Sequence, residues 1–337
     1  MSKLYINDDN INDLDNCDYL TITKLTIFAP KNIILLLDKL YKFTNLQILY
    51  LCDNQITELK GLDKLVNLKE LSLSNNQLTE IKGLDKLVNL QILYLNYNQL
   101  TEIKGLDKLV NLQELYLNYN QLTEIKGLDK LVNLQKLYLN YNQITEIKDI
   151  NKLVYLQELY LDNNHITEIK EIDNLINLKN LYLSYNKITE IKGITKLVDL
   201  QELCLNNNHI IEIKGTNTLI SLHRLDLDNN QIIEIKELEH LINLQTLFLC
   251  ANKITQIKGL ENLVQLKRLY LQNNEITELT KIDNLRNLED LDLDNNQIKE
   301  LPLSLCDLIN INFVSYHNNP IEYIPSPVQR LLNRLKY

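Results

Sequence analysis

The sequence predicts an α/β solenoid, a stack of similar coils whose short strands pair into a parallel sheet. Two observations predict it. A leucine recurs every 22 residues without a slip, and a fixed period in this range is typical of a repeat array. Within each period, leucines alternate with polar residues over a short segment, which is the period of two of a strand. The recurring leucines are Leu46, Leu68, Leu90, Leu112, Leu134, Leu156, Leu178, Leu200, Leu222, Leu244, Leu266 and Leu288.

Residues 112–133 represent one coil, with positions counted from the recurring leucine. Leu115 and Leu117, at the fourth and sixth positions, are expected to point inward, and the residues beside them to solvent. Asn120 stands at the ninth position, which is Asn throughout the array. Because buried backbone groups must be paired, we expect these amides to form a hydrogen-bonded ladder along the stack.

The second half of each coil returns the chain to the next strand. It is too short for a long helix, so we expect irregular coil with a short 3₁₀ or α turn. All seven glycines fall at the sixteenth position, but other coils place charged residues there. We therefore expect a tight, exposed position that does not require a positive φ. The residues that replace glycine are Asp149, Glu171, Glu237 and Lys281.

The ends of the array depart from the repeat, as an open core requires caps. We predict an N-terminal cap with one degenerate repeat at 1–45, twelve repeats at 46–310, and a terminal repeat with a capping helix at 311–337. An amphipathic pattern predicts a helix over 33–43. Ser326 followed by Pro327 predicts the start of the last helix, whose apolar residues continue to Leu335.

Composition excludes several classes of function. The net charge is −9 and no run of Lys or Arg stands out, so we expect neither nucleic acid nor a membrane as partner. No apolar run could cross a bilayer and no secretory signal begins the chain. Five cysteines without zinc-motif spacing predict free thiols in a cytoplasmic or other reducing intracellular compartment, with no metal and no cofactor.

The repeated segment L-x-x-L-x-L-x-x-N-x-I-T-E-I-K resembles the 22-residue class of the leucine-rich repeat family. Similar repeats occur in a regulatory subunit of type-1 protein phosphatase and in bacterial internalins. The resemblance implies a right-handed, horseshoe-shaped solenoid, with the sheet on a concave, protein-binding face and short 3₁₀ or irregular segments on the convex face. This sequence has no residue-by-residue match to the binding side chains of the phosphatase regulators, so their roles are not assigned to any residue here. The composition also resembles repeat proteins of giant amoebal viruses or AT-rich protists.

Tyrosines gather at two solvent-facing positions, the fifth and the eighth. Strands of a parallel sheet lie about 4.8 Å apart, so five consecutive tyrosines at the fifth position form a stripe roughly 20 Å long. Tyrosine is enriched at interface hot spots, which favours a binding surface. Recent duplication of nearly identical coils is the alternative explanation. The predicted partner-binding residues are Tyr94, Tyr97, Tyr116, Tyr119, Tyr138, Tyr141, Tyr160, Tyr182 and Tyr185.

Acidic residues gather nearer the C-terminus, where they could steer a basic partner segment or simply keep the surface soluble. They are Asp226, Asp228, Glu289, Asp290, Asp292 and Asp294. No nucleophile–base–acid set or phosphate-binding loop appears, so we predict no enzyme. The sequence favours a monomeric module that binds a protein partner on its tyrosine-rich face. The alternatives are a phosphatase-regulator-like adaptor and a passive structural or decoy array.

Overall fold

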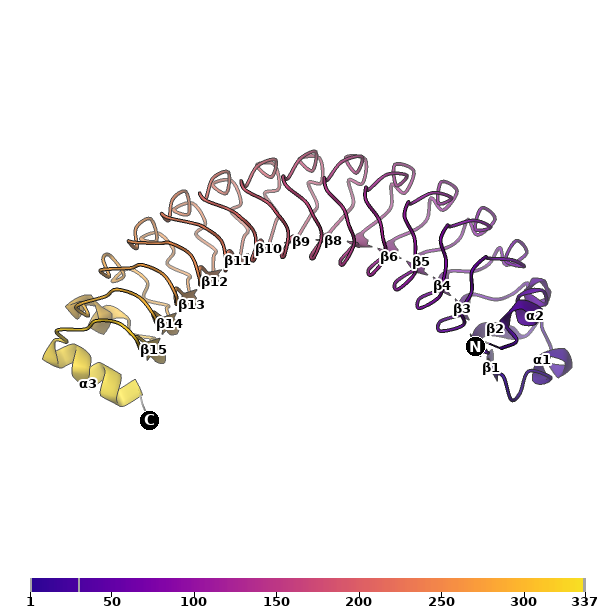
Figure 1. Ribbon diagram of the computed structural model, residues 1–337, viewed down its shortest axis with the longest axis horizontal. Helices are drawn as coiled ribbons and strands as arrows, with labels where there is room; N and C mark the ends of the chain where they lie inside the picture. The colour runs from indigo at the N-terminus through magenta and orange to yellow at the C-terminus, as the bar shows by residue number, and fades with distance from the viewer. Residues whose placement is uncertain (1, 30, 336–337) are drawn as a thin grey trace. The chain divides into compact units, whose positions relative to one another are not determined.

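The computed structural model describes residues 2–29 and 31–335, and the chain divides into two units, 1–165 and 166–337. Of the predicted caps, residues 1, 30, 336 and 337 lie outside the described part. Within each unit the strands line one side of the stacked coils and the return segments line the other (Figure 1). The predicted solenoid with a parallel sheet is confirmed.

In the first unit, eight strands pair in chain order, all in parallel. They are β1 (Ser2–Asn7), β2 (Ile22–Phe28), β3 (Ile48–Tyr50), β4 (Glu70–Ser72), β5 (Ile92–Tyr94), β6 (Glu114–Tyr116), β7 (Lys136–Tyr138) and β8 (Glu158–Tyr160). The helical elements of this unit lie near its N-terminus. They are α1 (Asp13–Asn16), α2 (Ile33–Leu37) and the 3₁₀ helix η1 (Leu40–Lys42).

In the second unit, seven strands pair in the same way. They are β9 (Asn180–Tyr182), β10 (Glu202–Cys204), β11 (Arg224–Asp226), β12 (Thr246–Phe248), β13 (Arg268–Tyr270), β14 (Asp290–Asp292) and β15 (Phe313–Ser315). The 3₁₀ helix η2 (Leu303–Asp307) and the helix α3 (Ser326–Leu335) follow near the C-terminus. No helix among the described residues has the length and apolar character needed to span a membrane.

The core confirms the assignment of inward and outward positions. Leu115 and Leu117 are fully buried, and so are the leucines and isoleucines of the return segment in the same coil. The strands stay in register, so that equivalent residues of neighbouring coils are direct partners. Backbone bonds continue past the strand, with the Leu117 amide donating to the Tyr138 carbonyl at 2.8 Å.

The ninth-position ladder is also confirmed. Asn120 is buried, and its Nδ2 donates to the carbonyls of Leu95 and Leu117 at 3.0 and 3.1 Å. Its Oδ1 accepts the backbone amide of Leu100 at 3.0 Å. One side chain therefore forms hydrogen bonds with backbone groups of its own coil and of the preceding coil. These buried backbone groups need such a partner because they lie outside the regular strands.

One of the two expectations for the return segment is confirmed. In the coil 112–133, the segment from Ile125 is irregular coil with two short turns of the 3₁₀ type, in which Leu131 N–H donates to Leu128 O at 2.9 Å and Leu134 N–H donates to Leu131 O at 3.0 Å. The other expectation was wrong, because the sixteenth position has a positive φ in four coils where it is not glycine. The non-glycine φ values are 63° at Asp149 and 56° at Glu171, Glu237 and Lys281.

The tightness of that position was predicted correctly. A Cβ placed on Gly105 or Gly127 would come closer to a carbonyl oxygen of the preceding coil than real Cβ atoms do. Carbonyl oxygens cannot move away without breaking the turn, which explains why glycine dominates here.

The two ends differ in how well the sequence predicted them. The helix expected over 33–43 is divided into α2, which ends at Leu37, and η1, which begins at Leu40. An unexpected strand, β1, extends the sheet beyond β2, and Ile6 on β1 is fully buried. The C-terminal helix begins at Ser326 as predicted, and its Val328 and Leu332 are buried where α3 lies against η2 and β15.

Candidate functional site

The fifth-position tyrosines of the first unit form a stacked column on the solvent side of the sheet, here called the inner column (Tyr94, Tyr116, Tyr138 and Tyr160). Neighbouring ring centroids lie 4.5, 4.5 and 4.4 Å apart, with interplanar angles of 21°, 10° and 10°. The parallel register causes this stacking, since each tyrosine is the direct strand partner of the next.

Carboxylates hold the inner column in place. The hydroxyl of Tyr116 donates to Glu114 at 2.6 Å, and that of Tyr138 donates to Glu158 at 2.8 Å. Lys136 lies between these two carboxylates, at 3.7 and 3.6 Å. Burial and the carboxylate bonds raise the pKa values of Tyr116 and Tyr138 well above the usual range. The inner column is thus half-buried and held in a fixed orientation.

The eighth-position tyrosines form a second, outer column (Tyr97, Tyr119 and Tyr141). Their ring centroids lie 4.2 Å apart in both pairs, and their exposed fractions are 52%, 39% and 46%. Desolvation, followed by the hydroxyls of Tyr141 and Tyr97, raises the pKa of Tyr119 to about 12. The outer column presents hydroxyl groups and ring edges to solvent.

The outer tyrosines adopt a backbone conformation that tyrosine disfavours. Their φ angles are 54°, 56° and 56°, in the left-handed region. Asparagine enters this region several-fold more readily than bulky residues do, because its short side chain bonds locally. Asn75 and Asn163 occupy the same position in flanking coils, with φ of 59° and 56°. The tyrosines therefore adopt a strained backbone conformation that asparagine adopts more readily.

The remaining predicted residues, Tyr182 and Tyr185, belong to the second unit. Tyr182 is half-buried and its hydroxyl donates to Glu202. Tyr185 is 55% exposed with φ of 56°, as in the outer column. The first unit thus brings seven of the nine predicted tyrosines together, in two columns of different character.

Stacking decides which part of each ring a partner can reach. Inside a column the neighbouring rings cover both faces, so only edges and hydroxyl groups are available to a partner. Exposed aromatic edges beside amide groups suit a polar–apolar protein surface. The seventh-position Asn96, Asn118 and Asn140 lie between the columns and carry no charge.

Comparisons with known proteins bear on the family. The family model of Leucine Rich repeats (2 copies) matches residues 44–86, 88–130, 132–175, 176–219, 220–262 and 264–305, which together cover most of the chain. The chain belongs to the leucine-rich repeat family.

Two bacterial leucine-rich repeat structures are similar to this one. A leucine-rich repeat protein of Leptospira interrogans is 32% identical, with a TM-score of 0.76, over 93% of this chain and 88% of the other. An internalin of Listeria monocytogenes, inlF, is 29% identical, with a TM-score of 0.73, over 82% of each chain. They confirm the resemblance to internalin repeats and give no support to a viral origin. No curated protein matched the chain.

A more distant leucine-rich repeat structure is relevant to the prediction that nucleic acid is not a partner. The TLR13–ssRNA13 complex is 24% identical, with a TM-score of 0.73, over 94% of this chain and 49% of that chain. At this identity it shows only the shared fold, so the exclusion of nucleic acid stays a prediction. Leucine-rich repeat folds are typically non-enzymatic interaction scaffolds.

Sequence reasoning missed two further periodic features of this leucine-rich repeat array. At the seventh position, Asn118 accepts the amide of Asn140 at 2.8 Å, which makes a second, outer ladder. At the twenty-second position, Asn111 donates to the carbonyl of Val88 in the preceding coil at 2.9 Å, which makes a third. The 22-residue period indicates both, because asparagine recurs at the seventh position in three consecutive coils and at the twenty-second position in most coils.

Two of the predicted acidic residues, Asp226 and Asp228, form a partly buried group at β11 and β12, whereas the other four lie at or beside β14. Burial raises the pKa of Asp228 to about 6, although the backbone amide of Cys250 donates to its Oδ1 at 2.6 Å. Burial likewise raises the pKa of Asp226, which pairs with Arg224 at 3.3 Å. Arg224 in turn lies over the Phe248 ring at 4.4 Å. Among the described residues, no group of three or more His, Cys, Asp or Glu side chains could hold a metal ion.

Proposed function

We propose that this protein is a non-enzymatic interaction module that binds a protein partner on the sheet face of its repeats. The outer column makes the central contacts and the inner column supports it. The observation that carries the proposal is the placement of three stacked, exposed tyrosines in the left-handed region. A strained, bulky residue persists where its side chain has a role that the relaxed residue cannot fill.

The chemistry of this face favours protein as the partner. Tyrosine provides large contact area and a polar tip with little rotamer freedom to lose, which is why it dominates many interface hot spots. Lys136 is held between two carboxylates, so the columns offer no free cationic row for a phosphate backbone. Tyr182 and Tyr185 provide the same chemistry in the second unit.

The test replaces the outer tyrosines with the residue that neighbouring coils already use. Wild type and the triple variant Tyr97→Asn, Tyr119→Asn and Tyr141→Asn serve as matched baits, and a partner retained only by wild type is purified. We then expect Tyr119→Asn to weaken its binding about 30-fold, the loss typical of a hot spot near 2 kcal/mol.

The control is Glu102→Ala, which alters an exposed ion pair with Lys104 in the return segment. It should leave affinity unchanged, since exposed pairs contribute little. Equal binding by wild type and the triple variant, with loss in the control, would show that the wrong face was chosen. If no partner is retained by wild type, the passive-array alternative is favoured instead.

A further inference from the structure

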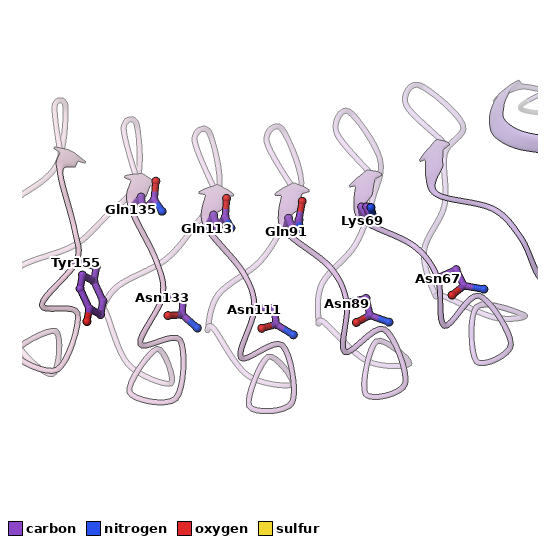
Figure 2. A pocket seen from close by; sticks show the side chains of 9 residues that line it. All are labelled: Asn67, Lys69, Asn89, Gln91, Asn111, Gln113, Asn133, Gln135 and Tyr155. Atoms are coloured by element: carbon purple, nitrogen blue, oxygen red, sulfur yellow. The ribbon is translucent and has the colours of Figure 1, made fainter. Parts of the chain in front are cut away.

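A separate groove of ≈ 700 Å³ runs across several coils of the first unit, beside the N-terminal ends of the strands. Figure 2 shows two rows of side chains along it, one of asparagines that ends at Tyr155 and one that is mainly glutamines. The rows follow the coils, so each coil adds one residue to each row. The lining residues are Asn67, Asn89, Asn111, Asn133, Tyr155, Lys69, Gln91, Gln113 and Gln135.

The asparagine row is fixed in orientation but retains free hydrogen-bonding capacity. Asn89 Nδ2 donates to Val66 O and Asn133 Nδ2 donates to Val110 O, both at 2.9 Å. An amide has two N–H donors and a carbonyl acceptor, so each asparagine keeps one donor and its oxygen for a ligand. Gln91 and Gln113 form no side-chain hydrogen bond with any described residue.

The groove is nearly free of charge in an acidic chain. Lys69, at one end, is the one charged side chain among the lining residues, whereas the chain as a whole carries a net charge of −9. Neither a polyanion nor a basic segment would find complementary charge there. The groove therefore suits a neutral ligand that is rich in hydrogen-bonding groups.

Apolar surface accompanies the amides. Tyr155 replaces asparagine at the end of its row and is 56% exposed. A ligand with hydroxyl edges and C–H faces would satisfy both kinds of surface, and sugar rings have this character.

The repeat distance distinguishes a glycan from an extended peptide. Neighbouring strands lie about 4.8 Å apart, whereas groups on one side of an extended peptide recur every ~6.6 Å, twice the rise per residue. A peptide laid along the groove would fall out of step with the amides after one or two coils. A linear β-1,4-linked glycan advances by close to one coil spacing per ring, and successive rings are turned over. Each ring can therefore lie between one asparagine and one glutamine, and it presents the same edge to a given row at every second coil.

We propose that this groove binds a linear, uncharged, β-1,4-linked oligosaccharide. Gln91, Gln113 and Gln135 pair with ring hydroxyls, and Tyr155 contacts the C–H face of a terminal ring. The groove and the tyrosine columns are different surfaces, so this binding is independent of the protein partner proposed above.

The experiment is calorimetric titration of the full chain with cellohexaose and, separately, with chitohexaose. The two arms distinguish a ring hydroxyl from an acetamido group at the same carbon. Saturable binding of at least one is expected. Gln113→Ala and Tyr155→Asn should each weaken it about tenfold, because each removes a hydrogen-bonding or stacking contact.

Two controls keep the outcome interpretable. Gln121→Ala alters an exposed glutamine at the tenth position of the same unit, outside the groove, and should leave sugar binding unchanged. Tyr119→Asn should also retain sugar binding, which separates this proposal from that for the protein partner. The proposal is overturned if neither sugar binds at millimolar concentration, or if the groove variants bind as tightly as wild type does.

Discussion

At the scale of single residues, side-chain amides provide hydrogen bonds to backbone groups that are paired by regular secondary structure in other folds. Each coil contains only a three-residue strand, so much of its backbone has no ladder partner. Asparagines meet that need at the ninth position of every coil and at the seventh and twenty-second positions of several coils. Their burial decreases in the order ninth, seventh, twenty-second. The composition of the chain follows from this, because asparagine is the residue whose amide best reproduces backbone hydrogen bonding.

The ladders should differ in their contribution to stability. We expect Asn120→Ala to lower the free energy of unfolding by about 1–3 kcal/mol, because three buried backbone groups lose their partner. Asn111→Ala removes one exposed bond and should cost about 0.5–1 kcal/mol. Urea unfolding measures both. Equal effects would contradict the role of burial.

Asp228 predicts a pH dependence of stability. Its pKa in the folded chain is about 6, above the ordinary 3.8, so between these values the folded state binds more protons than the unfolded state. This contribution to stability therefore falls as pH rises from 4 to 6. Asp228→Asn keeps an acceptor for the Cys250 amide and removes the buried charge.

The free energy of unfolding of the variant should equal that of wild type near pH 3.5 and should be larger than that of wild type at pH 7. We expect a gain of about 1–2 kcal/mol, after allowance for solvent screening. Thermal unfolding across this range tests the sign. A difference between variant and wild type that does not change with pH would contradict the raised pKa.

At the scale of elements, the ends of the array are built from different structures than its middle. β1 and α1 precede the degenerate strand β2, and α3 follows the last strand. We propose that these segments close the open ends of the core, as predicted for 1–45 and 311–337. Leu14 on α1 and Leu332 on α3 are both buried, which an exposed appendage would not require.

The C-terminal helix should protect its neighbours and little else. Leu332→Ala should cost about 2–4 kcal/mol locally by leaving a cavity against η2 and β15. Amide exchange should accelerate in β15, while β9 at the other end of the unit keeps its protection, since coils contact only their neighbours. Arg330→Ala, on the exposed side of α3, is the matched control. Acceleration spread evenly over the unit would rule out local capping.

At the scale of the whole molecule, the coils within each unit interact with their direct neighbours. The hydrogen bonds of the ladders join residues 20 to 25 positions apart. A coil therefore needs a neighbour of the right register and does not depend on more distant parts of the chain.

This architecture predicts tolerance of a whole added coil. A second copy of residues 112–133 inserted after Asn133 should leave the protein soluble, with cooperative unfolding and stability at least equal to wild type. The inserted leucines should bury the same apolar surface as the leucines from which they are copied. The same insertion with Asp at the positions copied from Leu115 and Leu117 should destabilise the array. Circular dichroism melts compare them, and a large loss of stability on the unaltered insertion would refute nearest-neighbour stacking.

The sequence by itself determined the coil, its register and its core. The period of 22, the alternation around Leu115 and Leu117, and the ninth-position Asn120 are local patterns, and every coil repeats the same chemistry. The helix start at Ser326 was also readable, because a Ser-Pro cap acts within one turn.

Only the tertiary structure decided how the repeated side chains differ from one another. Tyr116 and Tyr119 are three residues apart, yet one is fixed by Glu114 and the other is exposed in the left-handed region. The positive φ of Asp149 and the groove between two amide rows likewise depend on how one coil lies against the next. The physical reason is that stacking brings together residues about 22 positions apart. Their contacts, and the backbone conformation those contacts impose, are properties of the assembled array.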